Sequence, residues 1–117
     1  MANILLSEAD PDVRRLLIVL LDRLGHEAIV LGGGLAAPPP GDLLLLEPAS
    51  TACLEQARIV RERQPSIPVI CVSILPPEAC FLSLGPLAYL AKPFALDDLD
   101  AAIEAALAAS ECTLRLG

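Results

Sequence analysis

Four apolar runs in this sequence each end at a polar side chain that could do chemistry. Glu8 and Lys92 follow the first and last of these runs, Ser73 ends another, and Glu47 closes the run Leu43–Leu46. If the runs are parallel strands of one sheet, these side chains meet at its carboxyl edge, where open α/β sheets hold their functional sites. Two carboxylates and an ammonium group there predict an ion pair between Glu47 and Lys92. Glu47 is either a reactive carboxylate, which makes the protein a chemical switch, or the replacement of one, which makes it a binding surface.

The chain alternates between strand-like and helix-like segments, which predicts a parallel sheet with right-handed crossovers. Leu43–Leu46 is apolar at every position, as in a strand buried on both faces. An apolar stripe at helical spacing follows Pro11 and predicts a helix that Gly25 ends. The stripe consists of Val13, Leu16, Leu17, Leu20, Leu21 and Leu24. The other expected strands are Ile4–Leu6, Ala28–Leu31, Val69–Ser73 and Leu87–Leu90, and the other expected helices are Thr51–Gln64, a short one from Pro76 to about Leu84, and Leu96–Ala109.

Asp10 lies directly before Pro11 and has two interpretations. An aspartate followed by proline is a typical helix start, with the carboxylate as N-cap and proline at the first helical position. Asp10 could instead serve together with Glu8 as an acidic ligand of a metal ion. The sequence favours the N-cap.

The segment between the second and third strands is unusual. Gly32–Gly34 and Pro38–Pro40 leave only the three residues Leu35–Ala37 between them. Glycine and proline are the poorest helix formers, and three residues cannot sustain a helix. We therefore expect a Gly/Pro loop where a regular alternation of strands and helices would place the second helix.

Size and composition restrict the class of protein. The 117 residues fit one domain, which we place at residues 1–109, with residues 110–117 as a tail or the start of a linker. No apolar run approaches the roughly 20 residues of a membrane span, and a net charge of -7 argues against a nucleic-acid partner. The four cysteines are widely spaced, without a C-x-x-C pair and with one histidine in the chain. This pattern favours free thiols in the cytoplasm over a disulfide framework or a metal cluster.

The order of these landmarks resembles the response-regulator receiver family, the CheY-like domains. The segment ILLSEADPDVRRLL from Ile4 to Leu17 is similar to the opening of a receiver, and YLAKPF from Tyr89 to Phe94 is similar to its fifth strand. The resemblance covers about residues 2–109. It implies a flavodoxin-like (βα)5 sandwich with a parallel sheet in the order 2-1-3-4-5, here with the second helix missing or replaced by the Gly/Pro loop.

The resemblance also implies roles at the sheet edge. A typical receiver holds Mg²⁺ with two adjacent carboxylates after the first strand and accepts a phosphoryl group on an aspartate after the third. This sequence has Glu8 followed by Ala9 at the first position and Glu47 at the second. Phosphoryl transfer tolerates misplacement of about 1 Å poorly, and glutamate is longer than aspartate by a methylene group. We therefore predict a vestigial site, without phosphorylation by the family's mechanism and without tight Mg²⁺ binding.

Of the remaining positions of the family's site, Ser73 and Tyr89 keep two interpretations each. Ser73 matches the hydroxyl that contacts the phosphoryl group, or it is a small residue that ends a strand. Tyr89 matches the family's rotameric switch, or it packs statically in a core with few aromatic residues. Lys92 matches the lysine that contacts the phosphoryl oxygens, and the resemblance implies a cis peptide before Pro93.

Together these observations predict a pseudo-receiver. This is a non-enzymatic signalling module without a cofactor, which acts through contacts with a signalling protein or another domain of the same pathway. Loss of the second helix should bare apolar surface that could also form a homodimer. One alternative is a phosphorylatable receiver with a non-standard acidic site. Another is a small flavodoxin-like ligand-binding or enzymatic domain, against which the loop Ser7–Asp12 argues because it lacks a hydroxyl-rich phosphate cradle.

Overall fold

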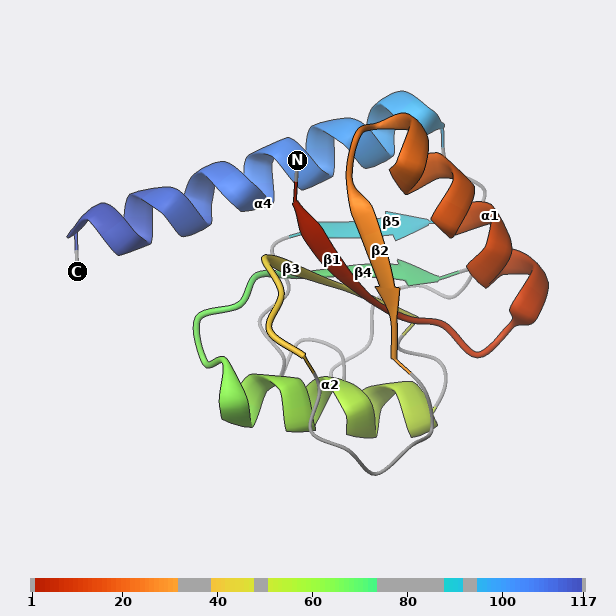
Figure 1. Cartoon of the computed structure of the whole chain (residues 1–117), viewed down its shortest axis with the longest axis horizontal. Coiled ribbons are helices and arrows are strands. Elements are labelled where there is room, and N and C mark those ends of the chain that lie inside the picture. The colour runs from red at the N-terminus through yellow and green to blue at the C-terminus, as the bar shows by residue number, and fades with distance from the viewer. Residues whose placement is uncertain (1, 32–38, 48–50, 74–87, 92–94, 117) are drawn as a thin grey trace.

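Five parallel strands form one sheet in the order β2-β1-β3-β4-β5 (Figure 1). The computed structural model describes residues 2–31, 39–47, 51–73, 88–91 and 95–116. This order confirms the predicted flavodoxin-like topology. The strands are β1 (Asn3–Ser7), β2 (Glu27–Val30), β3 (Leu43–Leu46), β4 (Val69–Ser73) and β5 (Ala88–Ala91).

The described helices cover the sheet on both sides and make a three-layer sandwich (Figure 1). The helices α1 (Pro11–Arg23) and α4 (Leu96–Leu116) pack on one face, and α2 (Thr51–Arg63) packs on the other. In the described part of the chain, no helix is both long and apolar enough to cross a membrane.

The strand β3 confirms the prediction of a strand buried on both faces. Leu43 and Leu45 belong to the core beneath α1 and α4, whereas Leu44 and Leu46 belong to the core beneath α2. All four are 0% exposed, because successive side chains of a strand point to opposite faces and both faces are covered. Burying each leucine stabilises the fold by about 1.5–3 kcal/mol relative to exposure.

The start of α1 confirms Asp10 as its N-cap. Asp10 Oδ1 accepts hydrogen bonds from the amide of Asp12 at 2.9 Å and from the amide of Val13 at 3.4 Å. These amides belong to the first helical turn and have no partner within the helix. Gly25 follows the helix with a φ of 85°, a left-handed conformation that suits glycine.

The packing of α1 corrects one expectation. Leu17 and Leu21 are 0% exposed and anchor the helix, but Leu16 is 55% exposed. Leu16 lies about 100° around the helix from Leu17, which takes it past the edge of the contact with the sheet. The buried stripe of α1 is therefore narrower than its leucine content predicts.

The C-terminal helix also differs from its prediction. Its expected end was Ala109, with a tail after it, whereas α4 continues to Leu116. The segment from Ser110 to Leu116 contains no proline or glycine, so no helix-terminating residue occurs before Gly117. The end of the domain at residue 109 stays a prediction.

Two predicted segments fall partly or wholly outside the described residues. The Gly/Pro loop includes residues 32–38, and the short helix after Pro76 lies within residues 74–87. Around the first of these gaps, Leu31 and residues 39–42 are in neither a helix nor a strand.

Candidate functional site

The two carboxylates predicted to meet at the carboxyl edge do directly follow neighbouring strands. Ser7 is opposite Leu46 in the parallel pairing of β1 with β3, and the Glu47 amide donates to the Ser7 carbonyl at 3.0 Å. Glu8 and Glu47 therefore follow adjacent strand ends. Both are buried, at 6% and 8% exposure. The structure thus brings together these two predicted site residues.

Burial of two carboxylates requires compensating interactions, because an unpaired buried charge is costly. Glu8 Oε1 accepts a hydrogen bond from the Asp10 amide at 3.3 Å, which holds the side chain against its own loop. Glu8 and Glu47 both have partners in the structure. Glu8 and Glu47 are therefore both buried and held by interactions within the protein.

The donor set at this edge does not fit the family's arrangement for Mg²⁺. The position after Glu8 is Ala9, whose side chain is exposed and offers no oxygen. The next acidic residue, Asp10, uses Oδ1 to cap α1. No group of three or more His, Cys, Asp or Glu side chains within the described ranges is placed to hold a metal ion.

Cys71 is a neighbour of the site that the sequence interpretation missed. It lies on β4 opposite Leu46, is 0% exposed, and feels the charge of Glu47. Burial, with a smaller contribution from Glu47, raises the pKa of the Cys71 thiol to about 11. The thiol is therefore neutral at physiological pH and is not an activated nucleophile. Its signal in the sequence was its place two residues before Ser73.

Ser7 is a second feature that the sequence interpretation missed. Its side chain is 0% exposed and lies on the α2 side of β1, where its hydroxyl donates to Gln56 Oε1. Gln56 Nε2 in turn donates to the carbonyl of Leu31 at 3.5 Å. This chain of hydrogen bonds joins the last residue of β1, the helix α2 and the residue after β2. Its only signal in the sequence was a polar residue directly after the apolar run Ile4–Leu6.

The other predicted site residues are described in part or not at all. Ser73 ends β4 with its backbone opposite Ala91, and Tyr89 lies opposite Cys71 in β5. Their side chains are outside the described part of the structure, as are Lys92 and Pro93. The predicted ion pair between Glu47 and Lys92 therefore stays a prediction, and so do the roles of Ser73 and Tyr89 and the cis peptide before Pro93.

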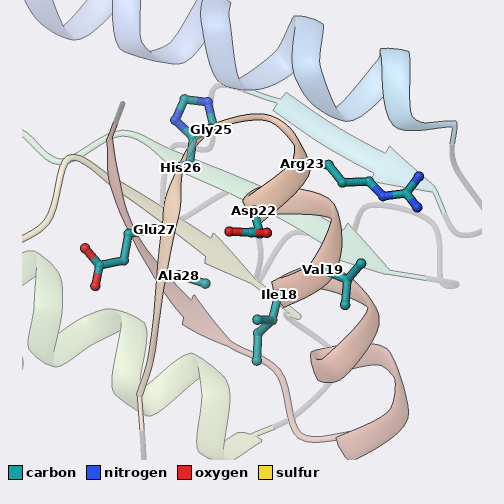
Figure 2. Close-up of a pocket in the computed structure, with 8 residues that line it drawn as sticks. All are labelled: Ile18, Val19, Asp22, Arg23, Gly25, His26, Glu27 and Ala28. Atoms are coloured by element: carbon teal, nitrogen blue, oxygen red, sulfur yellow. The ribbon is translucent and has the colours of Figure 1, made fainter.

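A pocket elsewhere on the molecule does not add to this site. It has a volume of about 660 Å³ and lies between the C-terminal half of α1 and the start of β2 (Figure 2). His26 lines it, but Figure 2 shows the imidazole pointing away from Ile18 and Ala28. His26 Nδ1 accepts from the Ala2 amide at 3.1 Å, and Nε2 is buried without a hydrogen-bond partner. His26 thus joins the turn after α1 to the residue before β1.

Comparison with known proteins identifies the fold. No protein-family model and no curated protein matches the chain. Among solved structures, it is similar to the receiver domain of a modulated diguanylate cyclase from Desulfovibrio desulfuricans, with a TM-score of 0.81, 22% identity, and coverage of 97% of this chain and 98% of that one. The fold is that of a receiver domain.

Two further structures give the same result. NtrX from Brucella abortus in complex with ATP matches with a TM-score of 0.82 and 24% identity over 98% of this chain, which spans only 29% of the NtrX chain. The receiver domain of a sensor histidine kinase from Pseudomonas aeruginosa matches with a TM-score of 0.77 and 22% identity, over 92% of this chain and 98% of that one. That structure holds a magnesium ion in its active-site cleft.

Proposed function

We propose that this protein is a two-component-type signalling module that acts through protein–protein contacts without phosphorylation of Glu47. The observation that carries the proposal is the edge of the sheet at β1 and β3. There a buried glutamate stands where the family has its phosphoacceptor aspartate, and Ala9 stands where the family has its second acidic ligand.

The lack of a paired acid matters because phosphoryl transfer depends on neutralising charge. A metal ion and an ammonium group normally balance the negative charge on the transferring group. Here Glu8 is held by the Asp10 amide and Asp10 caps α1, so neither is presented as half of an adjacent pair. A phosphoryl group would approach two buried carboxylates without the metal ion that normally balances part of its charge. The module is accordingly non-enzymatic and needs neither Mg²⁺ nor another cofactor.

Glu47 supplies a permanent charge in place of a transient one. A carboxylate carries one negative charge, whereas a phosphoryl group carries about 1.5 to 2 at neutral pH. In the proposed ion pair, Lys92 binds Glu47 as it would bind a phosphoryl oxygen in the family. The domain therefore presents one fixed surface, which a cytoplasmic signalling protein or another domain of the pathway binds. A homodimer through the apolar surface that loss of the second helix is expected to bare stays a second proposed assembly.

Incubation with a small phosphodonor and Mg²⁺, followed by intact mass spectrometry, tests this proposal. We expect no phosphoryl adduct of about 80 Da. The positive control is the double variant Ala9→Asp with Glu47→Asp, which restores both acids of the family pattern and should gain an adduct that is stable in acid and labile in alkali. An adduct of this kind on the unmodified protein would favour the phosphorylatable receiver instead.

A further inference from the structure

The helix α1 exposes three large apolar side chains. Leu16, Ile18 and Val19 are 55%, 37% and 48% exposed, and Val30 and Ile59 are the other exposed large apolar residues among the side chains whose burial the structure describes. A cluster of exposed apolar side chains on one helix is typical of an interaction surface.

Four exposed residues form a single stripe along this face. Asp12, Leu16, Val19 and Arg23 recur at i, i+4, i+7 and i+11, the spacing that keeps side chains on one line of a helix. Figure 2 shows Val19 and Arg23 on the side of α1 that faces away from β2, whereas Ile18 points toward β2. The stripe is therefore open to a partner.

The order of residues in the stripe makes it complementary to itself. It begins with an acid, Asp12, ends with a base, Arg23, and has two apolar residues between them. When a second copy of the helix runs antiparallel, Asp12 lies opposite Arg23 of that copy and Leu16 lies opposite its Val19. Each contact occurs twice because the arrangement has a two-fold axis.

The residues beside the stripe repeat this pattern with the charges reversed. Arg15 and Asp22 are exposed and lie seven positions apart on the flank of the stripe. In the same antiparallel arrangement the Arg15 guanidinium approaches the Asp22 carboxylate of the second copy. A parallel arrangement would instead place Asp12 opposite Asp12 and Arg23 opposite Arg23, which brings like charges together along the stripe.

We propose that α1 forms an antiparallel, two-fold symmetric contact with α1 of a second copy of this chain. The charges favour this occupant over an anionic membrane, because the face carries as many acids as bases and the protein has a net charge of -7. One helix of 13 residues buries less surface than the roughly 1,200 Å² of a stable complex, so the dimer is weak. The proposal does not depend on the state of Glu47.

Sedimentation equilibrium of the full chain over a concentration series up to about 1 mM measures the dimer, which we expect to have a Kd of roughly 0.1 mM. Arg23→Glu places an acid opposite Asp12 in both contacts and should raise Kd at least about tenfold. Arg63→Glu is the matched control, since Arg63 is exposed in the last turn of α2 and the change of charge is the same. It should leave Kd within about twofold.

The apolar part of the contact has its own matched pair. Leu16→Ser should weaken the dimer at least about fivefold, whereas Ile59→Ser on α2, with a comparable exposed side chain, should leave it unchanged. Thermal unfolding of each variant shows that it remains folded.

Mixing two charge variants gives the sharpest test. Asp12→Arg alone should weaken the dimer as Arg23→Glu does, because bases then face each other. An equimolar mixture of these two variants restores opposite charges at both contacts and should form a heterodimer at least about tenfold tighter than either variant alone. A strictly monomeric protein at 1 mM would overturn the proposal, and so would a dimer that Arg23→Glu and Arg63→Glu affect equally.

Discussion

The face of the sheet covered by α1 and α4 differs from the face covered by α2 in what fills it. Beneath α1 and α4, every buried core side chain of the described residues is aliphatic. Beneath α2, the core includes the thiols of Cys53 and Cys71, and it borders the hydrogen-bonded side chains of Ser7 and Gln56.

The polar groups on the α2 face hold both described ends of the connection between β2 and β3. Gln56 donates to the carbonyl of Leu31 at one end. At the other end, Gln64 Oε1 accepts from the Gly41 amide at 3.1 Å, and its Nε2 donates to the Pro39 carbonyl at 3.4 Å. Hydrogen bonds from α2 and from the residue after it thus hold the described ends of this connection. In the family that the sequence resembles, a packed helix stands between the same two strands. The two faces should therefore respond differently to loss of volume and to loss of polar partners.

The largest expected effect is a loss of volume on the aliphatic face. Leu21→Ala should lower the free energy of unfolding by about 2–5 kcal/mol, because Leu21 is 0% exposed and its removal leaves a cavity. Leu16→Ala on the same helix should cost less than about 1 kcal/mol, since Leu16 is 55% exposed. Urea denaturation measures both. Equal losses would contradict the assignment of α1's buried stripe to Leu17 and Leu21.

Added side-chain volume at Gly41, in the connection between β2 and β3, should destabilise the packing on the α2 face. A Cβ atom added to Gly41 would lie 2.6 Å from Leu5 Cγ, so Gly41→Ala should destabilise the protein by about 1–3 kcal/mol. Leu5 belongs to the core beneath α2. In a Leu5→Ala background the same change should cost much less, because the contact is gone, and a double-mutant cycle in urea measures the difference. Additive costs would show that the clash is relieved elsewhere.

The sequence predicted the sheet well because the evidence for each strand is local. Leu43–Leu46 is apolar on both faces and confirms a central strand, and the pair Asp10 and Pro11 confirms the start of α1. The exposure of Leu16 could not be predicted in this way. It depends on how α1 is rotated about its own axis against the sheet, which helical periodicity does not contain.

The candidate site was predictable in its carboxylates but not in its surroundings. Glu8 and Glu47 follow strands, so parallel pairing alone brings them to one edge. The link from Ser7 to Gln56 joins residues 49 positions apart, and only the packing of α2 on β1 creates it. The proximity of Cys71 to Glu47 depends in the same way on the register between β3 and β4.

A third prediction uses the thiol on the α2 face. Because the folded state raises the pKa of Cys71 from 9.0 to about 11, the unfolded chain releases this proton first as pH rises. The contribution of the neutral thiol to stability is present below pH 9 and is lost between about pH 9 and 11, by roughly 2 kcal/mol. Urea denaturation at several pH values, compared with Cys71→Ala, isolates this part of the pH dependence. An identical alkaline slope in both proteins would show that other groups cause it.

The smallest expected effect is the loss of the hydrogen bonds at Gln64. Gln64→Ala removes one acceptor and one donor at a half-buried position, and each such bond contributes about 0.5–1.5 kcal/mol. We expect a loss near the lower end, about 1 kcal/mol in total, because water can reach the freed groups. Glu62→Ala is the control, since Glu62 is exposed two residues earlier. Hydrogen exchange of the Gly41 amide should rise in the Gln64 variant and not in the control. If the amide stays equally protected in both, apolar packing against Leu5 rather than Gln64 holds this end of the connection.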